Sequence, residues 1–370
     1  TTGRGAVPLR MSRLTKPFAF ALTMGMAAVA CAGGGTDGID QPALRAGGEE
    51  AQLTATLNGS GATFPKPFYE EVIAAYNEKQ PGVTANYAGG GSGQGRQNLQ
   101  DGVVDFAGSD GLVKPEDVPK YKGGEFLYVP TVAAPITVSY NLPAVREIVL
   151  DADTIARIFQ REIRQWDDPA IQGLNPGVNL PGTGITVARR SDGSGTTENF
   201  SKYLEAASPG TWKLKSGATV EWPPDTQAGN GNQGVAQIVK GTAGAIGYVD
   251  LSDAMASALL VASVKNKEGR VVKPTLEATS AALEGITVAD DLSYNPLNAG
   301  GERSYPISAP TWILVYTNQP DKAKGAALKS FLSFMLTEGQ DIASEIDYAK
   351  LPESLRQRAV SQIAKINVAA

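Results

Sequence analysis

The segment Arg189–Glu198 (RRSDGSGTTE) is the part of the chain that most restricts the possible folds. It follows an extended apolar run, 184–188, and precedes a helical pattern, 199–205. Gly193 and Gly195 can adopt positive φ, so the chain can turn tightly between the two patterns. A strand, a glycine turn and a helix in direct succession predict one unit of an α/β fold.

The same segment is a candidate anion site. The first N–H groups of the predicted helix have no partner inside the helix, and the helix dipole adds partial positive charge there. Ser194 and Thr196 add hydroxyl donors, and the guanidinium of Arg190 matches a tetrahedral oxyanion. The alternative interpretation is an ordinary strand-to-helix turn with a capped helix and a surface arginine.

A second strand–glycine–helix unit comes earlier in the chain. The strand pattern Val83–Tyr87 leads into the glycine-rich run 88–95 (AGGGSGQG), and a short helix follows through Asp101. The Gly-Lys-Ser/Thr ending of a Walker loop is absent. The next strand, 103–109, ends at Asp110, a position that would lie over a cleft. The alternative for this aspartate is a helix cap or a turn.

The remaining pattern predicts two parallel-rich α/β lobes. The first strand, near Leu53–Leu57, has the alternation of an edge strand, and Gly59–Pro65 (GSGATFP) reads as a turn that feeds a helix. Residues 127–132 and 136–141 predict a strand pair at which the chain crosses into the second lobe. Segment 305–316 predicts the return crossing.

Composition excludes several classes of function. The chain has 370 residues, enough for two domains, and its net charge of −5 argues against a nucleic-acid partner. It contains no histidine, which excludes His-based triads and histidine metal sites. The single cysteine, Cys31, excludes an intramolecular disulfide.

The N-terminus predicts a targeting segment. Residues 1–31 have the anatomy of a signal peptide, with a start at Met11, a short basic region and an apolar core. The tripeptide 28–30 (AVA) before Cys31 is similar to a bacterial lipobox, which predicts that this cysteine is lipidated. The alternative is a signal peptide cleaved nearby, with an incidental cysteine. Residues 32–52 predict a flexible tether.

One segment partly matches a sequence motif of an enzyme family. Asp151 and Asp153 follow an apolar run and superficially match the aspartyl nucleophile segment of haloacid-dehalogenase phosphatases. That motif requires Thr or Val at position 155, where this chain has Ile155. Both aspartates also serve well as acidic residues at the N-terminus of a helix, which is the interpretation we prefer.

Several windows together resemble the PstS family, the substrate-binding proteins of bacterial phosphate ABC transporters. The resemblance spans roughly Leu53 to Leu355. The stretches that carry it are 59–65 (GSGATFP), 87–95 (YAGGGSGQG), 104–110 (VDFAGSD), 166–181 (WDDPAIQGLNPGVNLP), 189–196 (RRSDGSGT), 244–249 (GAIGYV) and 305–307 (YPI). It implies a two-lobed periplasmic-binding-protein fold of type II, with two crossing strands. Lobe 1 would comprise 53–133 and 306–370, and lobe 2 would comprise 134–305.

The resemblance also implies a site and a cellular role. The family's phosphate contacts fall on positions that carry the same residue type here: Thr63, Phe64, Ser92, Asp110, Arg190, Ser194, Gly195 and Thr196. Phe64 would act through its backbone amide, and Asp192 would hold the arginine in place. The implied protein is an extracytoplasmic, lipid-anchored monomer that passes inorganic phosphate to an ABC permease. It would need no cofactor, metal or catalytic residue.

Ligand selectivity can be argued from chemistry. An ionised Asp110 only accepts hydrogen bonds, so it would accept the proton that phosphate carries near neutral pH. Sulfate has no proton to donate, so its oxygen lone pairs would face those of the carboxylate and leave a buried charge unpaired. Three alternatives stay open: a binder of another tetrahedral oxyanion, a secreted phosphatase that uses an aspartate, and a surface adhesin that retains the fold.

Overall fold

The computed structural model describes residues 52–369. The predicted signal peptide, the lipidation site Cys31 and all but the last residue of the predicted tether lie outside the described residues. Between residues 52 and 369, no helix is both long enough and apolar enough to cross a membrane.

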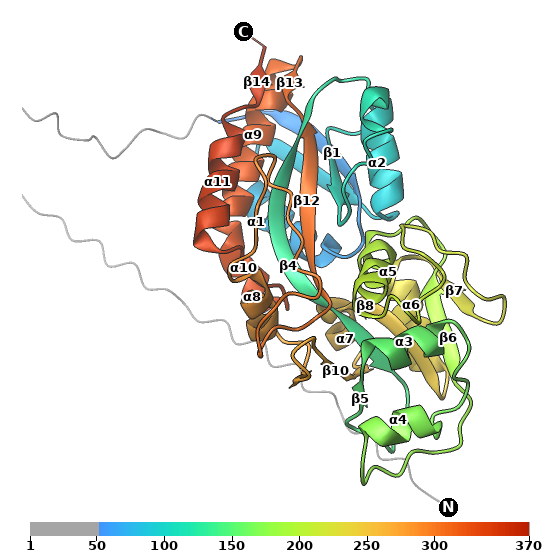
Figure 1. Ribbon diagram of the computed structural model, residues 1–370. Helices are drawn as coiled ribbons and strands as arrows, with labels where there is room; N and C mark the ends of the chain where they lie inside the picture. Colours follow the sequence, from blue (N-terminus) through green and yellow to red (C-terminus); the bar gives the residue numbers. More distant parts are fainter. Residues whose placement is uncertain (1–51, 370) are drawn as a thin grey trace, which may run out of the picture. The chain divides into compact units, whose positions relative to one another are not determined.

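One mixed sheet of nine strands runs through the described chain (Figure 1). Its order is β2-β1-β3-β12-β4-β8-β6-β7, and β9 pairs with β4 beside this path. The strands are β1 (Ala55–Gly61), β2 (Val83–Ala88), β3 (Phe106–Ser109), β4 (Phe126–Tyr140), β6 (Thr186–Arg190), β7 (Gln227–Gly229), β8 (Ala245–Asp250), β9 (Leu260–Val261) and β12 (Ser308–Tyr316). The pairs at the two ends of the sheet, β2–β1–β3 and β8–β6–β7, are parallel, and those in the middle are antiparallel.

Two long strands connect the two halves of the molecule. The first part of β4 pairs with β12, from Phe126↔Tyr316 to Pro135↔Ser308. Its last five residues pair with β8, from Ile136↔Asp250 to Tyr140↔Ile246. Figure 1 shows β4 passing from one half to the other, and β12 beside it makes the return. The predicted α/β fold of two lobes joined by two crossing strands is therefore confirmed.

Two local predictions were wrong. The strand pair 127–132 and 136–141 is one continuous strand, β4, because Pro135 keeps an extended φ and removes only one donor from the ladder. The first strand is not at an edge: β1 lies between β2 and β3, and it continues through Gly61 into the predicted turn. Alternation reports that one face of a strand is exposed, but not whether it has a neighbour on each side.

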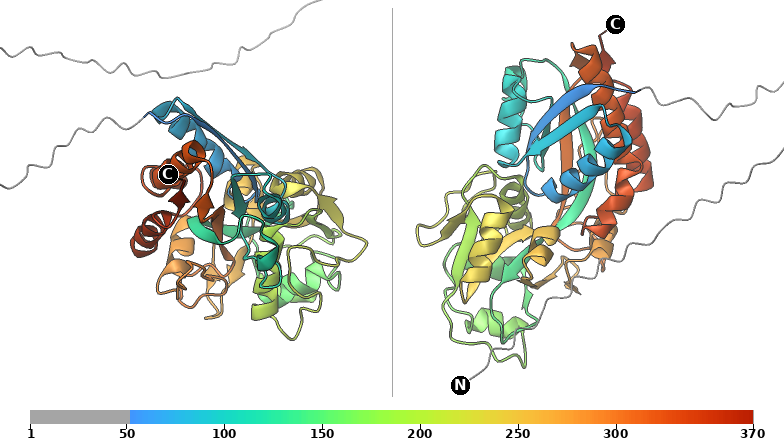
Figure 2. Two further views of the ribbon diagram at one scale, coloured as in Figure 1. Left: turned by 90° about the horizontal axis from the view of Figure 1, so that it is seen from above. Right: turned by 180° about the vertical axis from the view of Figure 1, so that it is seen from behind.

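Helices cover both faces of the sheet in each half (Figure 2). In lobe 1, α2 packs on β1 and β3, while α1 and α9 pack from the other side. The helices of this lobe are α1 (Lys66–Lys79), α2 (Ser92–Asp101), α9 (Lys322–Leu336), α10 (Gly339–Glu345) and α11 (Glu353–Ile363). Those of lobe 2 are α3 (Ala152–Phe159), α4 (Pro169–Leu174), α5 (Gly195–Ala207), α6 (Gly231–Gly241) and α7 (Leu251–Ala256).

Smaller elements complete the described chain. A three-stranded sheet has the order β11-β10-β5, and β13 pairs with β14 near the C-terminus. The bounds are β5 (Val149–Leu150), β10 (Ser263–Lys265), β11 (Val271–Val272), β13 (Asn318–Gln319), β14 (Asn367–Val368), α8 (Leu276–Leu283) and a 3₁₀ turn (Val118–Lys120). The exact lobe boundaries at residues 133/134 and 305/306 stay a prediction.

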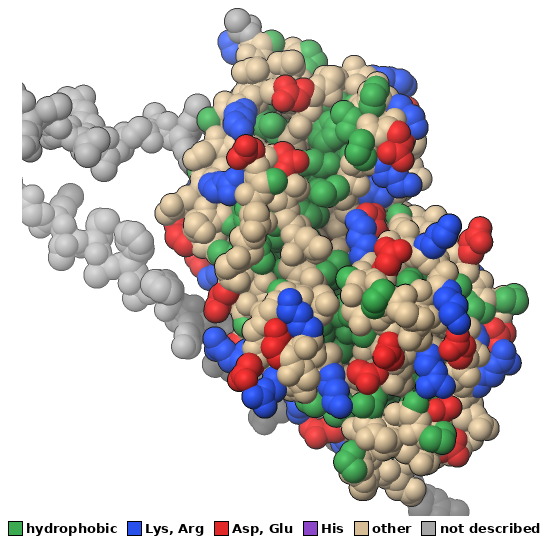
Figure 3. Space-filling model, in the orientation of Figure 1, with side chains coloured by type: hydrophobic (Ala, Val, Ile, Leu, Met, Phe, Trp, Pro, Cys, Tyr) green, Lys and Arg blue, Asp and Glu red, His purple; other side chains and the backbone are tan. Residues whose placement is uncertain are grey.

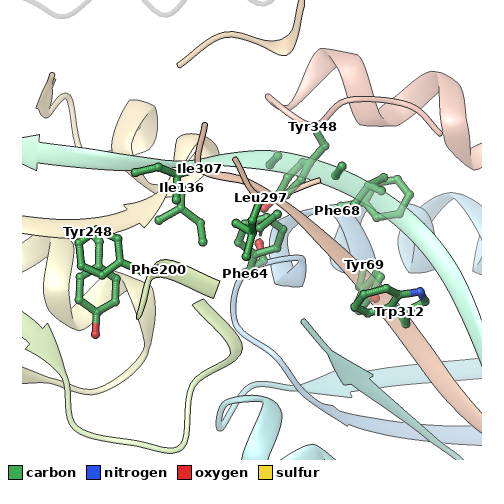
Figure 4. Close-up of a cluster of buried hydrophobic side chains, with 14 of the residues drawn as sticks. Phe64, Phe68, Tyr69, Ile136, Phe200, Tyr248, Leu297, Ile307, Trp312 and Tyr348 are labelled. Carbon is green, nitrogen blue, oxygen red and sulfur yellow. Dashed lines mark hydrogen bonds between the residues drawn. The ribbon is translucent and has the colours of Figure 1, made fainter. Parts of the chain in front are cut away.

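A continuous hydrophobic core holds the crossing in place (Figure 4). Phe200 stacks on Tyr248 in lobe 2, with ring centroids 4.4 Å apart and 15° between the planes. Ile136 and Ile307 lie at the crossing, and the core continues to Phe64 in lobe 1. The residues at the crossing are thus packed against the hydrophobic core of both lobes, which holds the ends of the crossing strands in place.

Candidate anion-binding site

The N-terminus of α5 leaves two backbone donors free. Ser194 caps the helix, since its Oγ accepts from the N–H of Thr197 at 3.1 Å, and its own N–H donates to Ala218 O at 2.9 Å. The N–H groups of Gly195 and Thr196 have no acceptor within the helix. No other acceptor in residues 52–369 lies within hydrogen-bond range of either group. This geometry presents two N–H groups and the positive end of the helix dipole to an anion.

Arg190 ends β6 beside these donors and is 3% exposed. Its Nε donates to Asp192 Oδ1 at 2.8 Å, and its Nη2 donates to Asp192 Oδ2. Its Nη1 donates to Asn232 Oδ1 at 2.6 Å. Burial alone would raise the pKa of Asp192, but the hydrogen bonds and charge of Arg190 hold that pKa below its ordinary value. The aspartate is therefore ionised and fixes the guanidinium.

Lobe 1 contributes a buried carboxylate and a hydroxyl. Asp110 follows β3 directly and is 2% exposed. Its Oδ1 accepts from Thr311 Oγ1 at 2.8 Å, and its Oδ2 accepts from Ser92 Oγ at 3.2 Å. Burial raises the pKa of Asp110 to about 7, although the Thr311 hydrogen bond and the charge of Arg190 oppose the rise. Asp110 therefore takes or loses a proton near neutral pH.

Thr63 and Phe64 lie between β1 and α1. Thr63 Oγ1 accepts from the N–H of Asn232 at 3.3 Å, a contact between the two lobes. The ring of Phe64 is buried in the core, and its carbonyl accepts from Tyr348 OH at 2.6 Å (Figure 4). Only the main-chain N–H of Phe64 can therefore serve a ligand, as the sequence resemblance implies.

The two lobes touch around this constellation. Gly93 N–H donates to Gly193 O at 2.9 Å, and Asn199 Nδ2 donates to Asp110 O at 2.6 Å. A Cβ on Gly195 would overlap Ser92 Oγ and lie 2.7 Å from Asp110 Oδ2, so only glycine permits this approach. The structure thus brings the predicted contacts of both lobes into one site.

A cavity of about 640 Å³ lies between the lobes beside the site. Gly93, Glu198 and Ala218 line it together with charged side chains of both lobes. Over the face drawn in Figure 3, acidic and basic side chains are interspersed. An anion at this site would therefore depend on the local donors rather than on a general positive field. Within residues 52–369, no group of three or more His, Cys, Asp or Glu could hold a metal ion.

Sequence reasoning missed several side chains of the site. These residues hold the predicted contacts or join the lobes: Arg96, Glu198, Asn199, Asn232 and Thr311. A weak signal existed for Asn232, which lies in a Gly/Asn-rich run before a helical pattern. No local signal marked Thr311, because it faces Asp110 from a strand 201 residues away.

The two aspartates of the enzyme-like motif lie at the N-terminus of α3, Asp151 as its cap and Asp153 in its first turn. Asp151 is the N-cap of α3 and accepts from the N–H of Thr154 at 2.9 Å. Asp153 accepts from the hydroxyls of Ser208 and Thr211. This agrees with the interpretation of both residues as helix N-terminal acids.

The family model and the relatives that match this chain indicate the same family. Residues 46–338 match the family model PBP_like_2, described as a PBP superfamily domain. The chain is 36% identical to the phosphate-binding protein PstS of Methanocaldococcus jannaschii, over 91% of this chain and 91% of that protein. It is 35% identical to PstS of Pasteurella multocida, over 83% and 89%. A solved phosphate-binding protein from Stenotrophomonas maltophilia shares the fold, with a TM-score of 0.66 at 20% identity over 83% of this chain and 93% of that one. The chain therefore belongs to the PstS family of phosphate-binding proteins within the PBP superfamily.

Proposed function

We propose that this protein binds inorganic phosphate with high affinity and delivers it to an ABC-type phosphate importer. The observation that carries the proposal is the convergence of three groups on one site. These are the free N–H groups at the start of α5, the buried guanidinium of Arg190 and the carboxyl of Asp110. Relatives named phosphate-binding protein PstS support the ligand.

The contacts would come from both lobes. Thr63, Ser92 and the Phe64 N–H act from lobe 1, and Arg190 with the start of α5 acts from lobe 2. A ligand held by both sides stabilises the closed arrangement, which couples binding to closure. Phosphate would be carried without covalent change. Turnover of a chromogenic phosphate ester by the purified protein would contradict that part of the proposal.

Calorimetric titration of the purified protein tests the proposal, after any co-purified phosphate has been removed. We expect one phosphate to bind per chain, with an affinity that excess sulfate at pH 8 does not reduce. The reason is that the ionised Asp110 accepts from a protonated oxyanion but repels one without a proton. Equal competition by sulfate would favour a general binder of tetrahedral oxyanions, and absence of binding would overturn the proposal.

We also propose that the protein is a monomer held outside the cytoplasm by a lipid on Cys31, where it meets the permease subunits. The support is the sequence of the first 31 residues. A Cys31→Ser variant should move from the membrane fraction to the soluble fraction, since the lipid is the only anchor in this proposal. Retention of the variant in the membrane would contradict it.

A further inference from the structure

Asn232 forms hydrogen bonds at both ends of its side chain. It is the second residue of α6 and is fully buried. Its Oδ1 accepts from Arg190 Nη1 at 2.6 Å, and its Nδ2 donates to Asp250 Oδ2 at 2.6 Å. Its backbone N–H donates across to Thr63 Oγ1 at 3.3 Å. One residue therefore connects the arginine of lobe 2 with a hydroxyl of lobe 1.

The bond to Arg190 completes the fixing of the guanidinium. Asp192 accepts from Nε and from one N–H of Nη2, and so holds one edge of the guanidinium. Asn232 takes one N–H of Nη1 on another side. A guanidinium has five N–H groups, and these bonds use three of them. The second N–H of Nη1 donates to Thr196 Oγ1 at the start of α5, over a longer distance of 3.5 Å.

The orientation of the Asn232 amide is determined by its two partners, Arg190 and Asp250. Asp250 is fully buried, caps α7 and accepts from the N–H of Asp253 at 3.0 Å. The guanidinium of Arg190 can only donate, so it takes the carbonyl end of the amide and turns the NH₂ end toward Asp250, which accepts. Burial and the neighbouring Asp253 raise the pKa of Asp250 well above its ordinary value, and a neutral carboxyl still has an oxygen that accepts from the amide. Asparagine is a small side chain that can accept from the guanidinium and donate to this carboxyl at the same time.

We propose that Asn232 is a positioning residue of the phosphate site, held between Arg190 and Asp250 and acting through the guanidinium of Arg190. This inference rests on the proposed function, since it concerns how the same site holds its ligand. It gives a role to the buried Asp250, which lies outside the predicted ligand contacts. It also places the start of α6 beside the start of α5 as a second element that shapes the site.

The test compares phosphate affinity of the full chain in the wild type and in Asn232→Ala. We expect the variant to bind phosphate at least about tenfold more weakly, because a buried hydrogen bond to a charged group is lost. Asn175→Ala is the matched control. Asn175 is also a buried asparagine of lobe 2, and it bonds to Val149 and Ile171 away from the site. Its substitution should lower the unfolding temperature and leave the phosphate Kd within twofold.

A spectroscopic measurement separates positioning from general damage. The Nε–H signal of Arg190 can be assigned by its loss in Arg190→Lys. In ligand-free Asn232→Ala, its exchange with solvent should rise at least tenfold, and in Asn175→Ala it should not change. If Asn232→Ala does not fold, Asn232→Ser carries the same two measurements. The inference would be overturned if the Asn232 variant kept the wild-type phosphate Kd. It would also be overturned if the Kd rose while the Nε–H exchange rate of Arg190 stayed unchanged. Failure of the wild type to bind phosphate would instead overturn the proposed function.

Discussion

Replacing Arg190 with alanine should weaken phosphate binding by at least ~3 kcal/mol, or more than about 100-fold. The side chain is almost completely buried, so the site excludes the water that would otherwise replace its donors. The substitution also removes the cationic partner of Asp192, whose carboxylate would then lie beside the anion without a counter-charge. Calorimetric titration at one pH and one salt concentration measures the change.

The neighbouring Arg189 is the matched control for this prediction. It is only partly buried, and it bonds to Thr226 Oγ1 and to the Arg190 carbonyl rather than to the site. Arg189→Ala should leave the affinity within about twofold. Arg190→Lys should lie between the wild type and Arg190→Ala, because it keeps the charge but loses the planar fork. Equal loss in Arg189→Ala and Arg190→Ala would show that general charge, not the fixed guanidinium, attracts phosphate.

The parts of the site that could be predicted lie in continuous segments. A glycine turn between a strand and a helix leaves the first N–H groups of the helix pointing outward, so this geometry at the start of α5 could be predicted from 189–198 alone. That these groups bind an anion stays a proposal. Asp110 could be predicted for the same kind of reason, since it directly follows β3. The eight predicted contacts as a set depended on the family resemblance and not on periodicity.

The parts that could not be predicted depend on contacts distant in sequence. Asn232 reaches Arg190 from 42 residues away, and Thr311 reaches Asp110 from 201 residues away. Such pairs leave no periodic pattern, because their positions are fixed by strand order and register. The same limit explains the wrong assignment of β1 to an edge. Its neighbours β2 and β3 follow later in the chain, and the exposed alternate side chains are the same in either case.

Asp110→Asn should remove most of the discrimination against sulfate at pH 8, lowering it by roughly 2–3 kcal/mol or about 30- to 150-fold. The amide can donate to an oxyanion that has no proton, whereas the carboxylate cannot. Burial raises the pKa of Asp110 to about 7, so the wild type should itself bind sulfate better as the pH falls below this value. Sulfate affinity of the variant should not depend on pH in this range. A parallel pH dependence in both proteins would contradict the role of Asp110.

The same substitution should change the stability of the ligand-free protein with a definite sign. The pKa of Asp110 is raised from 3.8 to about 7 on folding, so the folded state binds the extra proton between these values. The stability present below pH 4 is therefore lost as the pH rises through 7, by on the order of 4 kcal/mol. Asp250 and Asp253 also have raised pKa values from burial, but they are common to both proteins.

Denaturant unfolding at pH 4 and pH 8 isolates the contribution of Asp110 to the free energy of unfolding. The contributions of the other carboxyl groups cancel when the wild type and Asp110→Asn are compared at the same pH. The variant should be the more stable protein at pH 8, and the advantage should disappear at pH 4. Saturating phosphate should reverse the order at pH 8, since the ligand supplies the proton that the buried carboxylate lacks. A function that needs Asp110 ionised thus places a destabilising charge at the contact between the lobes, and the ligand relieves it on binding.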